Sequence, residues 1–177
     1  MLFGMCFFQF FIMQPVFYKL NWHFSEQFIG FLLALNGVLI AAVEMVLIHS
    51  LEGKRNGLVY ISGGILLGAL GFVLLNFVPP TAIAAILIVI LITFSEMMSM
   101  PFMNSFWISR TTDYNRGEYA ALYTMSWSAA QVFAPFIGGE VIAFGGFTLL
   151  WYMLGALSLV VAAGYFVLYK FTVKFNG

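Results

Sequence analysis

The sequence predicts an all-α membrane protein, a single bundle over residues 1–177 with six transmembrane helices. Hydrophobic residues make up 63% of the chain and charged residues 8%, and the mean hydropathy is +1.01. These values are typical of proteins that cross a bilayer several times. Each crossing needs about 20 apolar residues. Six such runs, joined by short links, cover residues 2–18, 26–49, 57–77, 81–108, 118–143 and 147–170.

The first three runs read as helices of the mature chain. Run 2–18 lacks the basic leader and the Ala-x-Ala-like cleavage site of a signal peptide, so we expect it to be retained. Run 26–49 carries Asn36 near its centre and Glu44 toward its end. Run 57–77 contains glycines that let a neighbouring backbone approach closely, at positions 57, 63, 64, 68 and 71.

The last three runs differ in their polar content. Pro101 lies five residues after Glu96 in run 81–108, and it is expected to bend that helix. Run 118–143 opens with Glu118, whose negative charge suits the positive end of a helix dipole. The centre of run 147–170 holds only glycines, Ser158 and apolar side chains.

The basic residues predict the orientation of the bundle, because short loops rich in Lys and Arg stay in the cytoplasm. Only Lys19 lies on one side of the predicted bilayer. The other side carries Lys54, Arg55, Arg110, Arg116, Lys170 and Lys174. We therefore expect an integral protein of the plasma (inner) membrane, with both termini cytoplasmic.

Polar residues near mid-helix occur in a regular order. Gln9, Asn36, Glu96 and Gln131 lie near the centres of the first, second, fourth and fifth runs, while the third and sixth have none. Two three-helix repeats of inverted topology would give this order. The sequence therefore predicts that these four side chains converge on one midplane cavity. The alternative for Gln9, Asn36 and Gln131 is a structural hydrogen bond between helices.

Glu96 is the leading candidate for a functional residue. A carboxylate at the centre of a bilayer costs about 2.5–3.5 kcal/mol on insertion scales, so it faces a protein interior or a water-filled path. We expect it to exchange a proton or to contact substrate; the alternative is a structural hydrogen bond to another helix. Thr93 and Met100, three and four residues away, are expected to share its face, although a methionine also serves as an ordinary gap-filler.

Glu44 is predicted to form a gate. It lies little more than a turn from the end of run 26–49, within expected reach of Lys54, Arg55 or Arg110. A salt bridge to one of these residues would close the cytoplasmic end of the bundle. The alternative is an acid that extends to the membrane surface without a partner.

Three stretches resemble the C-terminal half of a major facilitator superfamily transporter. Stretch 49–57 is similar to the acidic-then-basic cytoplasmic loop of that family, although its leading glycine and closing arginine pair are out of register. Stretches 116–119 (Arg-Gly-Glu-Tyr) and 134–139 (Ala-Pro-Phe-Ile-Gly-Gly) resemble its fifth helix, with Ala134 in place of the first glycine. Residues 35–45 resemble multidrug-type members.

The resemblance implies a second six-helix half, with substrate bound between the halves and moved by alternating access. Because the first run begins directly after Met1, we expect either a piece of a longer transporter or a half-transporter that works as a homodimer. The leading function is proton-coupled efflux of small apolar compounds. A uniporter or symporter for metabolites, and a non-transporting membrane scaffold, are the alternatives.

Other classes of function find little support. The sequence has no Gly-x-Ser-x-Gly elbow and no His-Glu-x-x-His pair, so neither a hydrolase nucleophile nor a metal site is predicted. We expect no enzyme activity and no cofactor. The formal net charge is zero, which gives nucleic acid no electrostatic reason to bind. The expected partners are the lipid bilayer, a small-molecule substrate, protons and the other half of the transporter.

Overall fold

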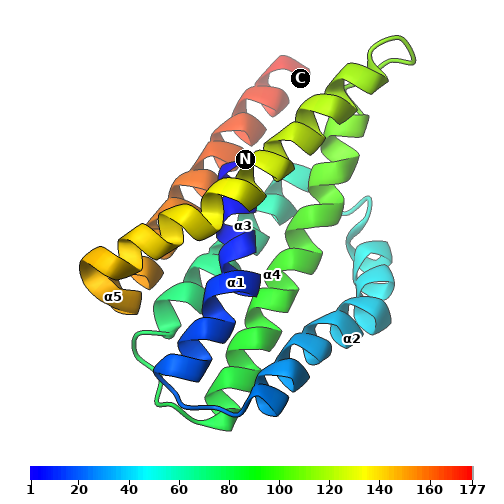
Figure 1. The fold of residues 1–177 in the computed structure, drawn as a ribbon. Coiled ribbons are helices and arrows are strands. Elements are labelled where there is room, and N and C mark those ends of the chain that lie inside the picture. Colours follow the sequence, from blue (N-terminus) through cyan, green and yellow to red (C-terminus); the bar gives the residue numbers. More distant parts are fainter. Residues whose placement is uncertain (177) are drawn as a thin grey trace.

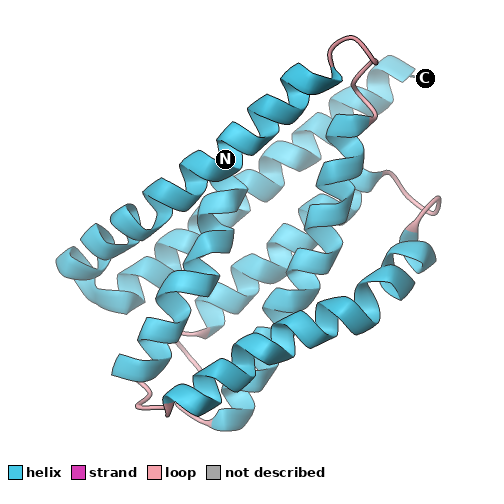
Figure 2. Cartoon of the chain, turned by 45° about the vertical axis from the view of Figure 1, so that its right-hand side comes forward, coloured by secondary structure: helices cyan, strands magenta, loops and turns pink. Residues whose placement is uncertain are grey.

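The computed structural model is built from helices, as the sequence predicts. It describes residues 1–176, with side chains through Thr172, so the side chain of Lys174 lies outside the description. No strand occurs within residues 1–176, and Figure 2 shows helices and loops alone. The elements in chain order are α1 (Leu2–Leu20), α2 (Glu26–Leu51), α3 (Gly57–Leu74), α4 (Ala82–Ile108) and α5 (Arg116–Asn176), as Figure 1 shows.

Helix α5 is not one continuous helix. Gly146 has φ 73° and ψ −176°, a conformation that glycine adopts without the strain a Cβ would bring. The chain reverses direction there, so that α5 has a first arm (116–145) and a second arm (147–176), as Figure 1 shows. The sequence predicted a break between residues 143 and 147, and the turn falls inside that interval.

Within the described residues, four elements are long and apolar enough to cross a membrane: α2, α3, α4 and α5. Helix α1 is long enough, but its polar residues lower its hydropathy. The structure therefore supports a membrane protein with several spanning helices. Six separate crossings, the inverted repeat and the cytoplasmic position of the termini stay predictions.

Side-chain caps fix the starts of three helices close to the predicted positions. Ser25 Oγ accepts a hydrogen bond from Phe28 N at 3.3 Å, Asn56 Oδ1 from Leu58 N at 3.0 Å, and Thr81 Oγ1 from Ala84 N at 3.3 Å. Each cap satisfies a backbone donor that the first turn of a helix leaves unpaired. The helix ends agree less well, since α3 stops at Leu74 rather than residue 77.

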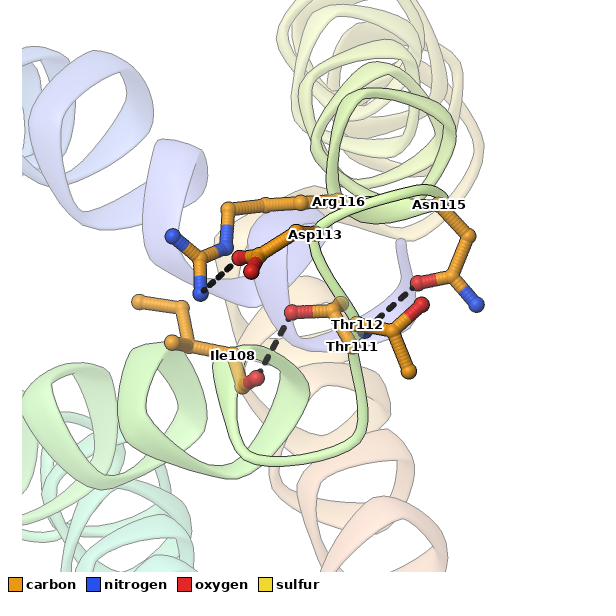
Figure 3. A network of polar contacts seen from close by, with 6 residues as sticks. All are labelled: Ile108, Thr111, Thr112, Asp113, Asn115 and Arg116. Carbon is orange, nitrogen blue, oxygen red and sulfur yellow. Dashed lines mark hydrogen bonds and ion pairs between the residues drawn. The ribbon is translucent and has the colours of Figure 1, made fainter.

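The link between α4 and α5 is held by local polar contacts (Figure 3). Thr112 N donates to Asn115 Oδ1 at 2.7 Å, and the Thr111 hydroxyl donates to the Ile108 carbonyl at 2.7 Å. Arg116 Nη2 lies 3.6 Å from Asp113 Oδ1. The basic charge of Arg116 is therefore engaged within its own link.

The tightest packing joins α3 to α4. A Cβ added at Gly64 would lie 2.8 Å from the Ser95 carbonyl oxygen, and one at Gly68 would lie 2.7 Å from Ser95 Oγ. A Cβ at Gly71 would lie 2.7 Å from Ile92 Cγ1. These contacts confirm the predicted close approach at Gly64, Gly68 and Gly71. A Cβ at Gly57 or Gly63 would make only ordinary contact, at 3.5 and 3.8 Å. The three close contacts place α4 firmly against α3, whereas α2 packs mainly on α4 and only weakly on α1.

Candidate functional site

The best-defined polar cluster joins the middle of α2 to the middle of α4. Asn36 Nδ2 donates hydrogen bonds to Glu96 Oε2 at 3.0 Å and to Thr93 Oγ1 at 3.0 Å. The Thr93 hydroxyl in turn donates to the Val89 carbonyl at 2.7 Å. Glu96 is 4% exposed and Thr93 is fully buried. The sequence predicted that Glu96, Asn36 and Thr93 act together, and the structure brings them into one network.

The Thr93 hydroxyl orients this network. Because it donates its proton to the backbone of its own helix, its lone pairs are left to accept from Asn36. The Asn36 amide is thereby held toward the Glu96 carboxyl group. A donor on Oε2 is compatible with either protonation state of Glu96, since the acid proton can reside on Oε1.

The second carboxyl oxygen of Glu96 is the unusual atom of the site. Glu96 Oε1 is buried and has no hydrogen-bond partner among the described residues. An unpaired buried polar group costs about 1–3 kcal/mol. Oε1 is therefore the carboxyl oxygen at which a proton would be most favourably placed.

Two cavities adjoin Glu96. The larger measures about 390 Å³ and lies between α2 and α4, with α1 forming a third wall. Its lining includes both Glu96 and Glu44, together with Phe7, Phe11, Met97, Met100 and Asn104. The smaller measures about 20 Å³ and is lined by Ser95 and Ser158 among mainly apolar side chains. That space suffices for a single water molecule, so Glu96 lines both a water-sized cavity and a larger one.

Helices α2 and α4, which contribute to the wall of the larger cavity, point the same way (Figure 1). Glu44 follows Asn36 by eight residues, and Asn104 follows Glu96 by eight. At 1.5 Å per residue these separations are about 12 Å. The wall of the cavity thus includes Glu96 at one level and Glu44 and Asn104 at another. Met100 lies between these levels and lines the cavity, as predicted.

Gln9 and Gln131 do not join Glu96. Gln9 is buried and donates from Nε2 to the Ala134 carbonyl of α5 at 2.6 Å. Gly138 makes room for it, since a Cβ there would lie 2.5 Å from Gln9 Oε1. Gln131 is exposed, one position beyond the buried Ala130. The expected convergence of four polar centres is therefore not formed, because Gln9 is used at the α1–α5 crossing and Gln131 turns outward.

The expected gate is also absent from this structure. Glu44 is half-buried, and within the described side chains it makes no ion pair with Lys54, Arg55 or Arg110. Arg110 instead lies over the Phe106 ring, with Cζ 5.2 Å from its centroid. Lys54 and Arg55 are exposed in the α2–α3 link, beyond the end of α2 at Leu51. Glu44 therefore belongs to the cavity wall rather than to a closed salt bridge.

Sequence reasoning missed several residues of the cavity. Asn104 could have been found from its spacing, because positions 93, 96, 100 and 104 recur on one helical face. Phe7 and Phe11 had no such signal, since α1 is rich in phenylalanine throughout. Which of its aromatic rings would meet α2 and α4 depended on how α1 is rotated in the bundle.

Comparison with known proteins gives no further assignment of this site. No protein-family model, no curated protein and no solved structure matches the chain.

Proposed function

We propose that this chain forms a six-helix half of a secondary transporter, which moves small molecules across a membrane by alternating access and uses Glu96 to couple that movement to protons. The observation that carries the proposal is the Asn36–Glu96 pair. It places a buried carboxyl group with one unpaired oxygen beside a cavity of about 390 Å³. Buried acids in membrane helices mark ion or substrate pathways.

The packing around α4 supports this proposal. One face of α4 is fixed against the glycines of α3. The face of α4 that bears Glu96 adjoins the cavity. Pro101 lines that cavity, and a proline inside a helix removes one backbone hydrogen bond and favours a bend. A rigid support on one side and a less restrained neighbour, α2, on the other suit an element that rearranges during transport.

The resemblance of residues 49–57, 116–119 and 134–139 to a major facilitator half supports the same proposal. It implies a partner, which would be a second half encoded in the same protein or a second copy of this chain. Efflux of small, largely apolar compounds driven by a proton gradient is the activity we propose. The inner membrane, cytoplasmic termini and the absence of enzyme activity belong to the same proposal.

The test is transport by the complete translated protein in proteoliposomes with an imposed pH gradient. We expect Glu96→Gln to abolish gradient-driven flux, because the amide cannot release a proton, while keeping an acceptor for Asn36. Glu140→Gln is the matched control, since Glu140 is an exposed acid of α5 outside the cavity. Flux that survives in Glu96→Gln and follows the substrate gradient alone would indicate a uniporter. No flux in the wild-type protein would favour a scaffold.

A further inference from the structure

A further large cavity lies between α4 and the two arms of α5, apart from the cavities that Glu96 lines. It measures about 700 Å³, and the first residues of α1 also contribute to its wall. Its lining is mainly apolar and aromatic and, within the described residues, includes no carboxylate. The proposed transport function, which depends on Glu96, therefore gives this cavity no role.

The second arm of α5 leaves the cavity open to its surroundings. Val160, Gly164 and Leu168 line it at successive helical turns, and all three are exposed. A Cβ added at Gly164 would meet nothing within 4 Å. Exposed apolar surface of this kind marks a contact with a partner or with membrane lipid. In a chain that spans a bilayer, the acyl chains of lipids are the apolar groups nearest to such an opening.

Three aromatic side chains indicate the level of this cavity in the membrane. The rings of Trp107 and Tyr123 are stacked with their centroids 5.5 Å apart, and the Trp127 ring lies 6.1 Å from that of Tyr123. All three line the cavity. Tryptophan and tyrosine gather where apolar tails meet polar headgroups, because each has an apolar ring and one polar atom. This part of the cavity therefore suits the headgroup region of a bilayer.

Arg110 supplies a positive charge beside the cavity. It follows Ile108, the last residue of α4, and its Cζ lies 5.2 Å from the centroid of the Phe106 ring. Phe106 itself lines the cavity. Neither of the ion pairs found among the described side chains involves Arg110. A guanidinium group is suited to phosphate, because its planar fork can donate two parallel hydrogen bonds.

We propose that this cavity binds an acidic phospholipid, with its phosphate group on Arg110 and one acyl chain along Val160, Gly164 and Leu168. Basic pockets between spanning helices on the cytoplasmic side bind anionic headgroups, and Arg110 belongs to the end of the bundle that is predicted to be cytoplasmic. Val160 and Leu168 are eight residues apart, so the wall extends for about 12 Å along the second arm. The site needs neither Glu96 nor a proton gradient, and it goes beyond the proposed function.

The test compares two phospholipids with the same acyl chains, the anionic phosphatidylglycerol and phosphatidylcholine, whose headgroup has no net charge. Native mass spectrometry of the complete protein in detergent measures the dissociation constant of each lipid. We expect phosphatidylglycerol to bind about fivefold more tightly, the factor that corresponds to about 1 kcal/mol for one basic residue at a membrane surface. Arg110→Gln should abolish this preference.

Lys170→Gln is the matched control for charge. Lys170 Nζ lies 5.0 Å from the centroid of the Phe166 ring, and neither residue lines the cavity. The preference for phosphatidylglycerol should therefore persist in this variant.

A second pair of variants tests the position of the acyl chain. Gly164→Phe places a ring inside the cavity, so both lipids should bind several-fold more weakly. Gly139→Phe is its control, because a Cβ at Gly139 also meets nothing within 4 Å but Gly139 does not line the cavity. Both affinities should be unchanged there. The residues replaced in these variants are all exposed, so their folding should be preserved.

Four results would overturn the inference. Equal affinity of the wild-type protein for the two lipids would remove the anionic headgroup, and a preference that survives Arg110→Gln would place that headgroup elsewhere. Unchanged binding in Gly164→Phe would show that the acyl chain does not enter the cavity. Displacement of phosphatidylglycerol by an equal concentration of soluble glycerol phosphate would show a site for a small anion instead of a lipid.

Discussion

Helix α4 meets α3 and α2 in two very different ways. Toward α3, Ile92, Ser95 and Ser99 approach Gly71, Gly68 and Gly64 so closely that no Cβ would fit. Toward α2, the contact includes the Asn36 network, and beside it lies a cavity of about 390 Å³. The two faces of α4 are offset by a single residue, since Ser95 and Ser99 precede Glu96 and Met100. One helix thereby serves as a fixed support on one side and as the wall of a candidate site on the other.

The largest expected effect would come from breaking the tight side. Gly64→Leu places a branched side chain against the Ser95 carbonyl and Met98 Cβ, which would lie 2.8 and 2.9 Å from its Cβ. We expect a loss of about 3 kcal/mol in the free energy of unfolding, at the upper end of typical overpacking costs. Denaturant unfolding in detergent micelles measures it.

Gly37→Leu is the matched control on the loose side. Gly37 is an exposed glycine of α2, and a Cβ there meets nothing within 4 Å. Replacing a mid-helix glycine raises helix propensity by up to about 1 kcal/mol, so stability should be unchanged or slightly increased. Equal destabilisation by both variants would contradict the contrast between the two faces.

An intermediate effect is expected from Asn36→Leu. The substitution removes the donor to Glu96 Oε2 and leaves both carboxyl oxygens of a buried residue unpaired. We expect a loss of about 1–3 kcal/mol in unfolding free energy.

The cost of Asn36→Leu should nearly vanish in a Glu96→Leu background, because the unpaired carboxyl group is then gone. A double-mutant cycle measures this coupling. Independent, additive effects of the two substitutions would show that the α2–α4 contact depends on packing rather than on the hydrogen bond.

The smallest effect is expected from Thr93→Val. Valine keeps the shape of threonine but cannot accept the hydrogen bond from Asn36, which spans 3.0 Å. Interhelical hydrogen bonds in membranes average about 0.6 kcal/mol, so the loss of stability should be of that order. Proton-driven flux should fall by more than the small loss of stability accounts for, because Asn36 would no longer be fixed toward Glu96. A variant with wild-type flux would show that Asn36 needs no such orientation.

The sequence was a good guide wherever one helix alone decides the outcome. The starts predicted at residues 26, 57 and 81 lie within one residue of the observed starts at 26, 57 and 82, and the glycines of α3 are visible as a packing surface. The face shared by Thr93, Glu96 and Met100 follows from helical spacing alone. The sequence was a poorer guide where the result depended on a second helix. Gln9 has the same predicted depth as Asn36 and also ends in an amide, yet it contacts the Ala134 carbonyl and not Glu96.

The sequence by itself determined that this chain is helical, apolar enough to span a membrane, and marked by a costly acid at position 96. Those properties depend on local composition and on the 3.6-residue period of a helix. The tertiary structure decided that Asn36 is the partner of Glu96 and that Glu44 lines the cavity beside Glu96. It also decided that Gln9 contacts α5 and that Gln131 is exposed. The physical reason is that packing against neighbouring helices sets the rotation and crossing angle of each helix. Gly138 of α5, which makes room for Gln9 of α1, is one example. The sequence pattern of a single helix does not contain that information.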